Sequence, residues 1–482
     1  MEDLELKIFP PADYKSIEKR EHNLKGIKNI LSVLGFYEEQ RVKAIKETPV
    51  MVSSVYGRIR SIVFHYDLGD EESTKNNAVE GLQLLIEELM RKMPRVDHFI
   101  LITNEVPKKD YKFKIESKLE KLGLADRLFL CKVIPISLNI SAWASDPYKA
   151  VYYVDGNEKR LHLFEPQNMI HRTGCADEEI LDKLFLTKKR IPQDIQNLFH
   201  SSHDEERFNL SFDGGNILVG ERFVLIGADT ESANVSKEEE LKEKFEKLLT
   251  GKKELLLLKG EPPQYYARPE LIETEGEIKN ILATREIRGI CCQPLFHLDL
   301  FITLAGEKDG KEQLVIGKPV VGLPMKTLRG LPYHTLGMIY DQIYQTEYSI
   351  QQVIKQLEGA STEFEIIRIP MPLTYHNDFK DHTIRKWYWA TYNNCIVEVT
   401  KNSEKTVWLP SYLHDYKKHY GESYSGWKDD LAPYEDEAKA IWKKLGFKVV
   451  MINAHFHMYA QSHGSLACLV NCIDRENQIE TI

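Results

Sequence analysis

Hydrophobic and polar residues follow a repeating order along the chain: an amphipathic helix, a short buried strand, then two strands joined by a turn. From residue 58 onward we count about five such units. In the first unit, apolar residues at helical spacing predict a helix over 78–93, and the apolar run 99–102 predicts a buried strand after it. Helices that alternate with short strands indicate an α/β fold.

The same pattern predicts the elements of the later units. Helices are expected over 271–284, 350–357 and 435–445, and strands over 255–258, 364–369 and 447–452. Ser236 and Glu239 form a capping box at the start of another helix, and Gly446 is expected to end the last one.

The spacing of the units bears on how they are arranged. A period of roughly 50 to 90 residues is too irregular for a solenoid, but such units can close radially around a central channel and leave no exposed sheet edge. Residues 1–58 are charged, favour helix and carry no chemical motif. We therefore expect an N-terminal helical extension of unknown role over 1–58 and one domain over 59–482.

Composition and charge restrict the partners. The 482 residues include 64 Lys and Arg against 73 Asp and Glu, which gives a formal charge of −9. This balance argues against nucleic acid or an anionic membrane as the main partner. With 42% hydrophobic residues the chain can bury a sizeable core, yet its apolar runs fall short of the roughly 18 to 20 residues that span a bilayer.

The chain start and the cysteines indicate the compartment. The acidic start Met1-Glu2-Asp3 lacks the basic and apolar regions of a secretory signal. Seven cysteines are scattered with no CxxC pair. We therefore expect a reduced, cytoplasmic protein in which most thiols are buried and one is a nucleophile.

Polar or reactive residues stand at the start of each predicted strand pair, where a radial arrangement would direct them toward a common axis. In chain order these candidates are Asp146, Asp213, Asn216, His297, Asp299, Asn393 with Asn394, and Cys468. Taken singly, each residue also fits an ordinary structural role. Cys468 could be a packed core thiol, His297 a hydrogen-bonded core histidine, and the Asp and Asn residues parts of turns. The His-x-Asp alternation, however, places His297 and Asp299 on one face of a strand.

In this order the motifs resemble those of the guanidino-group-modifying, or pentein, superfamily, which includes deiminases of arginine, agmatine and peptidylarginine and the amidinotransferases. The matching segments are Asp146-Pro147, Asp213 to Asn216, His297 to Phe301, Asn393 or Asn394, and Gly464 to Cys468. The resemblance covers about residues 80–482 and implies a five-module α/β propeller, with 59–482 as its catalytic domain.

Three details refine this resemblance. Ser145 and Ala467 stand where many family members have Arg and His, and both departures concern recognition of the substrate tail. Gly214-Gly215-Asn216 is closer to the agmatine-deiminase type than to the amidinotransferases.

The resemblance implies a role for each candidate, and the chemistry explains the residue types. A guanidinium is planar and always charged, so Asp146 and Asp299 are candidates to accept its N–H donors, with Asn216 and Asn394 as further substrate-binding residues. Its carbon is a poor electrophile, so Cys468 is expected to attack as a thiolate that positive charge from bound substrate and protonated His297 favours. His297 would act as general acid and base, oriented by Asp213.

The expected activity is hydrolysis of a guanidino compound, either a small molecule or a peptide arginine, to a ureido product and ammonia through a covalent thiouronium intermediate. No cofactor is expected. His455, His457 and His463 lack metal-site spacing, so we also expect no metal. The alternatives are an amidinotransferase, an inactive guanidine-binding pentein and a papain-like thiol hydrolase. A papain-like hydrolase is disfavoured because the catalytic cysteine of that class lies early in its chain, whereas Cys468 lies late in this one. The oligomeric state and the identity of the guanidine cannot be read from the sequence.

Overall fold

The protein is described here by a computed structural model. It describes residues 48–65, 77–104, 117, 120–121, 123–136, 142–146, 148–155, 158–164, 212–227, 230, 238–246, 253–260, 271–274, 277–280, 295, 297–331, 333–377, 384–413, 427–461 and 464–476. Most of the predicted N-terminal extension and Ser236 of the predicted capping box lie outside the described residues.

The fold is mixed α/β, and the described strands form five sheets. Four of these sheets contain the same unit: two antiparallel strands, a helical connection, and a third strand parallel to the second.

The four units are β7 (Ile217–Val219), β8 (Phe223–Gly227), α7 (Glu238–Phe245) and β9 (Glu254–Leu258); β12 (Ile302–Lys308), β13 (Lys311–Val321), α8 (Met325–Arg329), α9 (Tyr333–Glu358) and β14 (Phe364–Asn377); β16 (Ile396–Val399), β17 (Lys405–Ser411), α11 (Trp427–Lys444) and β18 (Lys448–Asn453); and β19 (Val470–Arg475), β2 (Ile59–His65), α2 (Asn77–Lys92) and β3 (His98–Asn104).

The remaining strands extend or complete this arrangement. After the 3₁₀ turn η2 (Ala125–Leu130), β4 (Cys131–Ile136) joins β3 in parallel. The fifth sheet is antiparallel and contains β1 (Thr48–Met51), β5 (Lys149–Asp155) and β6 (Glu158–Phe164). Strands β10 (Leu271–Thr274), β11 (Glu277–Asn280) and β15 (Ile384–Trp389) extend the sheet that contains β14.

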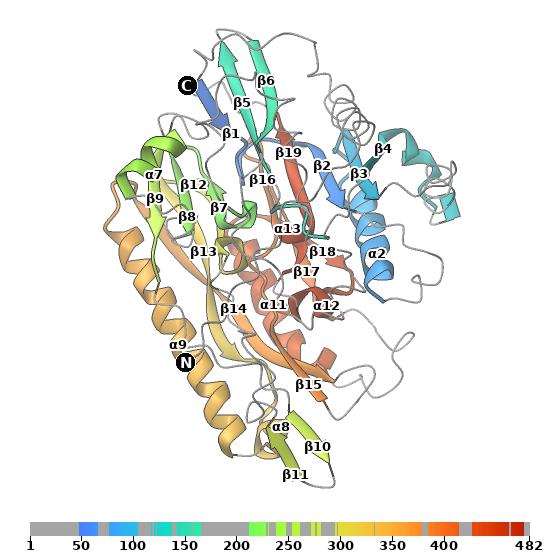
Figure 1. Ribbon diagram of the computed structural model, residues 1–482, viewed down its shortest axis with the longest axis vertical. Helices are drawn as coiled ribbons and strands as arrows, with labels where there is room; N and C mark the ends of the chain where they lie inside the picture. Colours follow the sequence, from blue (N-terminus) through green and yellow to red (C-terminus); the bar gives the residue numbers. More distant parts are fainter. Residues whose placement is uncertain are drawn as a thin grey trace, which may run out of the picture.

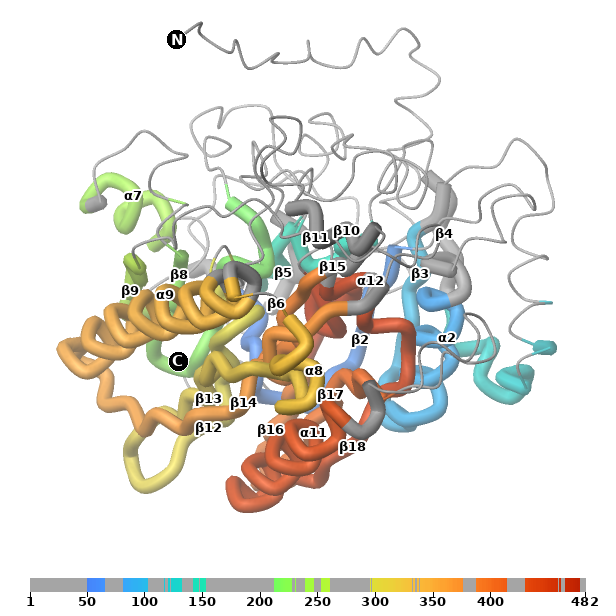
Figure 2. Tube along the Cα trace, turned by 90° about the horizontal axis from the view of Figure 1, so that it is seen from below, coloured from blue at the N-terminus to red at the C-terminus, as the bar shows by residue number. Residues whose placement is uncertain are grey.

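The two ends of the described chain meet in one sheet. Strand β19, close to the C-terminus, pairs antiparallel with β2, from the beginning of the described chain (Figure 1). Viewed from below, α2, α7, α9 and α11 lie on the outside of the molecule and the strands lie between them (Figure 2). The C-terminal strand β19 therefore completes the sheet that contains β2 and β3.

The amphipathic patterns explain how the helices pack. In α2, Leu82, Ile86 and Leu89 are buried, as their helical spacing predicts. Helix α11 ends where expected: Gly446 has a φ of 87°, and Phe447 N–H bonds to Trp442 O. This left-handed conformation suits glycine, which has no Cβ.

The helix predicted over 271–284 is wrong in its described part. Residues 271–274 and 277–280 form the antiparallel strands β10 and β11, in which Ile272 pairs with Lys279 and Thr274 with Glu277. Only two residues, one of them Gly276, connect the strands. A short glycine-containing connection between alternating segments is a hairpin signal, and it outweighed the helical pattern.

The helical character expected for residues 1–58 does not reach the end of that segment. Residues 48–51 form β1, which pairs with β5, and Ser53 Oγ donates to Val219 O at 3.1 Å. Residues 48–58 therefore belong to the same folded unit as the sheets. Among the described helices, none is long and apolar enough to span a membrane.

Candidate active site

Each candidate residue lies just before a strand, and these strands belong to five different sheets. Asp146 precedes β5, Asp213 precedes β7, His297 and Asp299 precede β12, Asn394 precedes β16, and Cys468 precedes β19 within the short helix α13 (Leu466–Leu469). All six side chains are buried, with exposed fractions of 7% or less. The order read from the sequence therefore corresponds to one repeated position in the fold.

His297 lies between two carboxylates. Its Nε2 is 3.0 Å from Asp213 Oδ2, and its Nδ1 is 3.8 Å from Asp146 Oδ1. Asp213 has extended backbone and its side chain makes no capping bond to the 3₁₀ turn η4 (Gly214–Asn216), so the carboxylate is directed to the histidine. Contacts on both sides fix the orientation of the imidazole ring.

Gly215 is the residue around which three of these groups meet. A Cβ atom there would lie 3.0 Å from Asp146 Oδ1, 3.0 Å from His297 Nδ1 and 3.1 Å from Asp299 Oδ2. Its backbone N–H donates to Asp146 Oδ1 at 3.2 Å. Glycine is required because any side chain would crowd the space that these three groups share.

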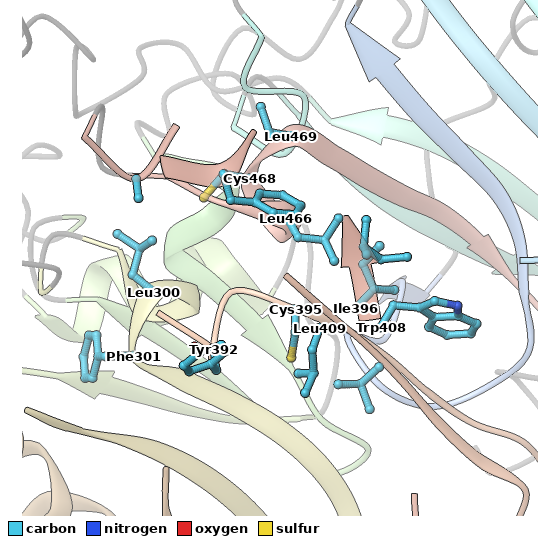
Figure 3. Packing of buried hydrophobic residues seen from close by; sticks show 14 of the residues in the cluster. Leu300, Phe301, Tyr392, Cys395, Ile396, Trp408, Leu409, Leu466, Cys468 and Leu469 are labelled. Carbon is cyan, nitrogen blue, oxygen red and sulfur yellow. The ribbon is translucent and has the colours of Figure 1, made fainter. Parts of the chain in front are cut away.

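Cys468 contacts Asp299 and Asn394. Its thiol donates to Asp299 Oδ2 at 3.6 Å, and Asn394 Nδ2 donates to the sulfur at 3.1 Å. Asn394 Oδ1 also accepts the backbone N–H of Cys468 at 3.1 Å. Figure 3 shows the Cys468 sulfur pointing toward the segment that carries Leu300, whereas Cys395 points toward Leu409.

Two amides predicted to bind substrate also make hydrogen bonds within the protein. Asn216 Oδ1 accepts the backbone N–H of Leu298 at 3.2 Å, which holds the turn after His297. Asn394 forms two hydrogen bonds with Cys468, and its neighbour Asn393 donates its side-chain N–H to Val315 O at 2.8 Å. In this structure the amides position the histidine and the cysteine. Among the described residues, the buried atoms Asp299 Oδ1 and Asn216 Nδ2 have no hydrogen-bond partner.

Comparisons with known proteins give distant likenesses. No protein-family model matches the chain, and no curated protein matches its sequence. Its structure is similar to that of C. jejuni agmatine deiminase, at 13% identity, a TM-score of 0.48, and coverage of 90% of this chain and 98% of that one. It is also similar to a provisionally assigned arginine deiminase from Porphyromonas gingivalis, at 12% identity, a TM-score of 0.45, and coverage of 88% and 97%.

Burial dominates the electrostatics of the site. It raises the pKa of Asp299 to about 6, with nearby Asp146 adding to the rise and His297 opposing it. Burial likewise raises the pKa of Asp146. Burial disfavours the charged form of these carboxylates, so a cation that binds beside them stabilises that form.

The pKa of the Cys468 thiol is raised well above its usual range by burial and by the negative charges of Asp299 and Asp146. The thiol is therefore protonated in the free protein. The thiolate expected from the sequence needs positive charge brought close to the two carboxylates.

Sequence reasoning missed two residues that adjoin the site. Lys149, the first residue of β5, lines a cavity of about 110 Å³ together with Asp299 and Gly215. Burial lowers the pKa of Lys149 to about 8, against the opposing effect of Asp299 and Asp146. Asn471 Nδ2 donates to Ala144 O and Tyr148 O, both at 3.1 Å, and so holds the loop around Asp146. The only sequence signal was their nearness to Asp146 and Cys468.

The residues that could hold a metal lie elsewhere. Within the described ranges, the one cluster with suitable spacing is Glu221, Glu307 and Glu312. In the histidine-rich stretch, His457 bonds to Tyr388 Oη and to Tyr412 O, so its ring nitrogens are engaged by the protein. His463 lies outside the described residues.

Proposed function

We propose that the protein is a cysteine-dependent deiminase of the guanidino-modifying pentein type, which hydrolyses a guanidino substrate to its ureido product and ammonia. The supporting observation is the contact between Cys468 and Asp299, beside a histidine oriented by Asp213. The proposal includes a five-module propeller, supported by the four repeated units, the fifth sheet, and the pairing of β19 with β2.

Substrate binding would begin at the two carboxylates around Gly215. Asp299 Oδ1 is a buried acceptor with no partner among the described residues, and the carboxylate pKa values of Asp146 and Asp299 are raised by burial. A guanidinium supplies paired N–H donors and one positive charge, which satisfies the unpaired oxygen and offsets the crowded negative charges. The site thus selects a planar cation.

The bound cation would also activate the cysteine. Its positive charge offsets the two aspartates that raise the pKa of the Cys468 thiol, so the thiolate becomes accessible when substrate is in place. The thiol proton passes to His297, and the resulting imidazolium is stabilised by Asp213 and Asp146 on its two sides. Asn394 keeps the sulfur in a fixed position.

The reaction then proceeds in two halves. Cys468 Sγ forms a bond to the guanidinium carbon, His297 returns its proton to the departing nitrogen, and the C–N bond breaks to release ammonia and leave a thiouronium. A water molecule gives a proton to His297 and adds to the same carbon. The C–S bond then breaks: His297 returns its proton to the leaving sulfur, and the added hydroxyl gives its proton to solvent water. This step yields the ureido product and restores the cysteine and the neutral histidine.

A panel of guanidines tests this proposal: arginine, agmatine, a peptide arginine and simple alkylguanidines. Ammonia and ureido product are measured with and without an amine acceptor. We expect both products in equal amounts without the acceptor. Turnover that requires the acceptor would indicate an amidinotransferase, and guanidine binding without turnover would indicate an inactive binding protein; either result contradicts the proposal.

A further inference from the structure

Helix α9 lies at the outer edge of the molecule (Figures 1 and 2). It carries a row of exposed tyrosines. Its inner face packs against β13 and β14. On the opposite face Tyr333, Tyr340, Tyr344 and Tyr348 are 94%, 53%, 70% and 49% exposed. Spacings of seven, four and four residues place these side chains on one side of the helix.

Within the described residues, no contact explains this row. Between residues 333 and 348 the exposed positions of the helix are Tyr333, Gly337, Tyr340, Tyr344 and Tyr348, and none is charged; the exposed charged residues Lys355 and Glu358 follow only near the end of the helix. A Cβ atom on Gly337 would meet nothing within 4 Å, so no packing inside the chain requires glycine there. Glycine is the poorest helix former apart from proline, and at this open position it leaves a notch in the tyrosine face.

We propose that this tyrosine face binds the same face of a second copy of the chain, with the two α9 helices antiparallel. A two-fold axis between Tyr340 and Tyr344 would bring those two tyrosines opposite each other. Tyr348 lies about 9 Å along the helix from such an axis and Gly337 about 7.5 Å, at a rise of 1.5 Å per residue. Tyr348 of one copy would therefore fill the notch at Gly337 of the other.

The exposed area matches the needs of a dimer. A tyrosine carries on the order of 200 Å² of surface, so the exposed parts of the four rings offer about 500 Å² per copy. The pair would bury about 1,000 Å² in total, which is the lower bound for a biological interface and typical of a weak dimer. Tyrosine is also the kind of residue that dominates interface energetics.

The oligomeric state of the full chain tests the proposal by light scattering after size exclusion and by sedimentation. We expect a particle of twice the chain mass of 55.9 kDa. The double variant Tyr340→Ser, Tyr344→Ser is expected to weaken dimerisation on the order of ten-fold or more. The control is Phe129→Ser, because Phe129 is 73% exposed on η2, away from this face.

A second variant separates the interface from folding. Gly337→Gln should raise the melting temperature of the monomer, because glutamine is the better helix former, and should weaken the dimer by filling the notch. A monomeric parent chain, or a dimer unchanged by the tyrosine variants, would overturn the proposal. So would a monomer that dimerises only after residues 1–47 are removed, because the face would then bind the chain's own segment.

Discussion

Asn394 holds Cys468 at two points: its side-chain oxygen accepts the cysteine's backbone N–H, and its side-chain nitrogen donates to the sulfur, each at 3.1 Å. The two residues lie 74 positions apart in the chain, in segments that precede different sheets. The sulfur is thus fixed in position from outside its own short helix.

Removing the two hydrogen bonds between Asn394 and Cys468 should reduce the catalytic rate more than the stability of the fold. Two buried hydrogen bonds, each worth about 0.5 to 1.5 kcal/mol, orient the nucleophile, so Asn394→Ala is expected to lower kcat/KM roughly 10- to 100-fold. The comparison variant is Asn393→Ala, whose side chain bonds to Val315 and Thr303 and not to Cys468. Equal losses of activity in both variants at equal stability would show that these two hydrogen bonds have no specific role.

The two aspartates beside the cysteine are predicted to recognise charge. Asp299→Asn and Asp146→Asn each keep the size of the side chain but remove a negative charge. Loss of one charge-assisted hydrogen bond, about 1.5 to 3 kcal/mol, corresponds to a loss of kcat/KM on the order of 10- to 100-fold. Binding of an uncharged urea-like product analogue should weaken far less. Equal weakening for both ligands would mean that the aspartates only shape the pocket.

Gly215 should not tolerate a methyl group. Gly215→Ala places a Cβ 3.0 to 3.1 Å from polar atoms of Asp146, His297 and Asp299, so at least one of these groups must move. The shift needed is a few tenths of an ångström, and a full 1 Å misplacement at a reacting centre can cost about 100-fold in rate, so we expect a loss on the order of 10-fold. Gly359→Ala is the matched control because its Cβ would meet only backbone oxygens at 3.6 Å or more. Parent-like kcat/KM for Gly215→Ala would contradict the described arrangement of the three groups.

Asp299 is also predicted to reduce stability. Its folded-state pKa of about 6 lies above the ordinary value of 3.8, so the folded protein holds this proton more tightly than the unfolded chain. The carboxylate therefore lowers the free energy of unfolding as pH rises from about 4 to about 6. The full cost above that window is roughly 3 kcal/mol, at 1.36 kcal/mol per pKa unit.

Urea unfolding at several pH values measures this cost. Asp299→Asn should be more stable than the parent at pH 7 to 8, and its advantage should shrink as pH falls toward 4. A difference between the two proteins that is independent of pH would contradict the raised pKa.

The sequence predicted the repeated unit and the order of the candidate residues because both depend on local pattern. Helical spacing gave α2, Gly446 gave the end of α11, and the motifs gave the positions before each sheet. Contacts between segments that are distant in the chain could not be predicted from the sequence. The bond from Asn394 to Cys468 and the hold of Asn471 on the loop around Asp146 depend on how the units meet, which no local pattern specifies.

The role of Cys468 is the centre of the proposed mechanism, and ammonia release by two cysteine variants tests it most directly. Cys468→Ala should keep its fold and lose turnover, because among the described cysteines it is the Cys468 sulfur that bonds to both Asp299 and Asn394. Cys472→Ala removes a thiol four residues away, in β19, and should keep most of the parent rate. Ammonia release by Cys468→Ala at the parent rate would contradict the covalent mechanism.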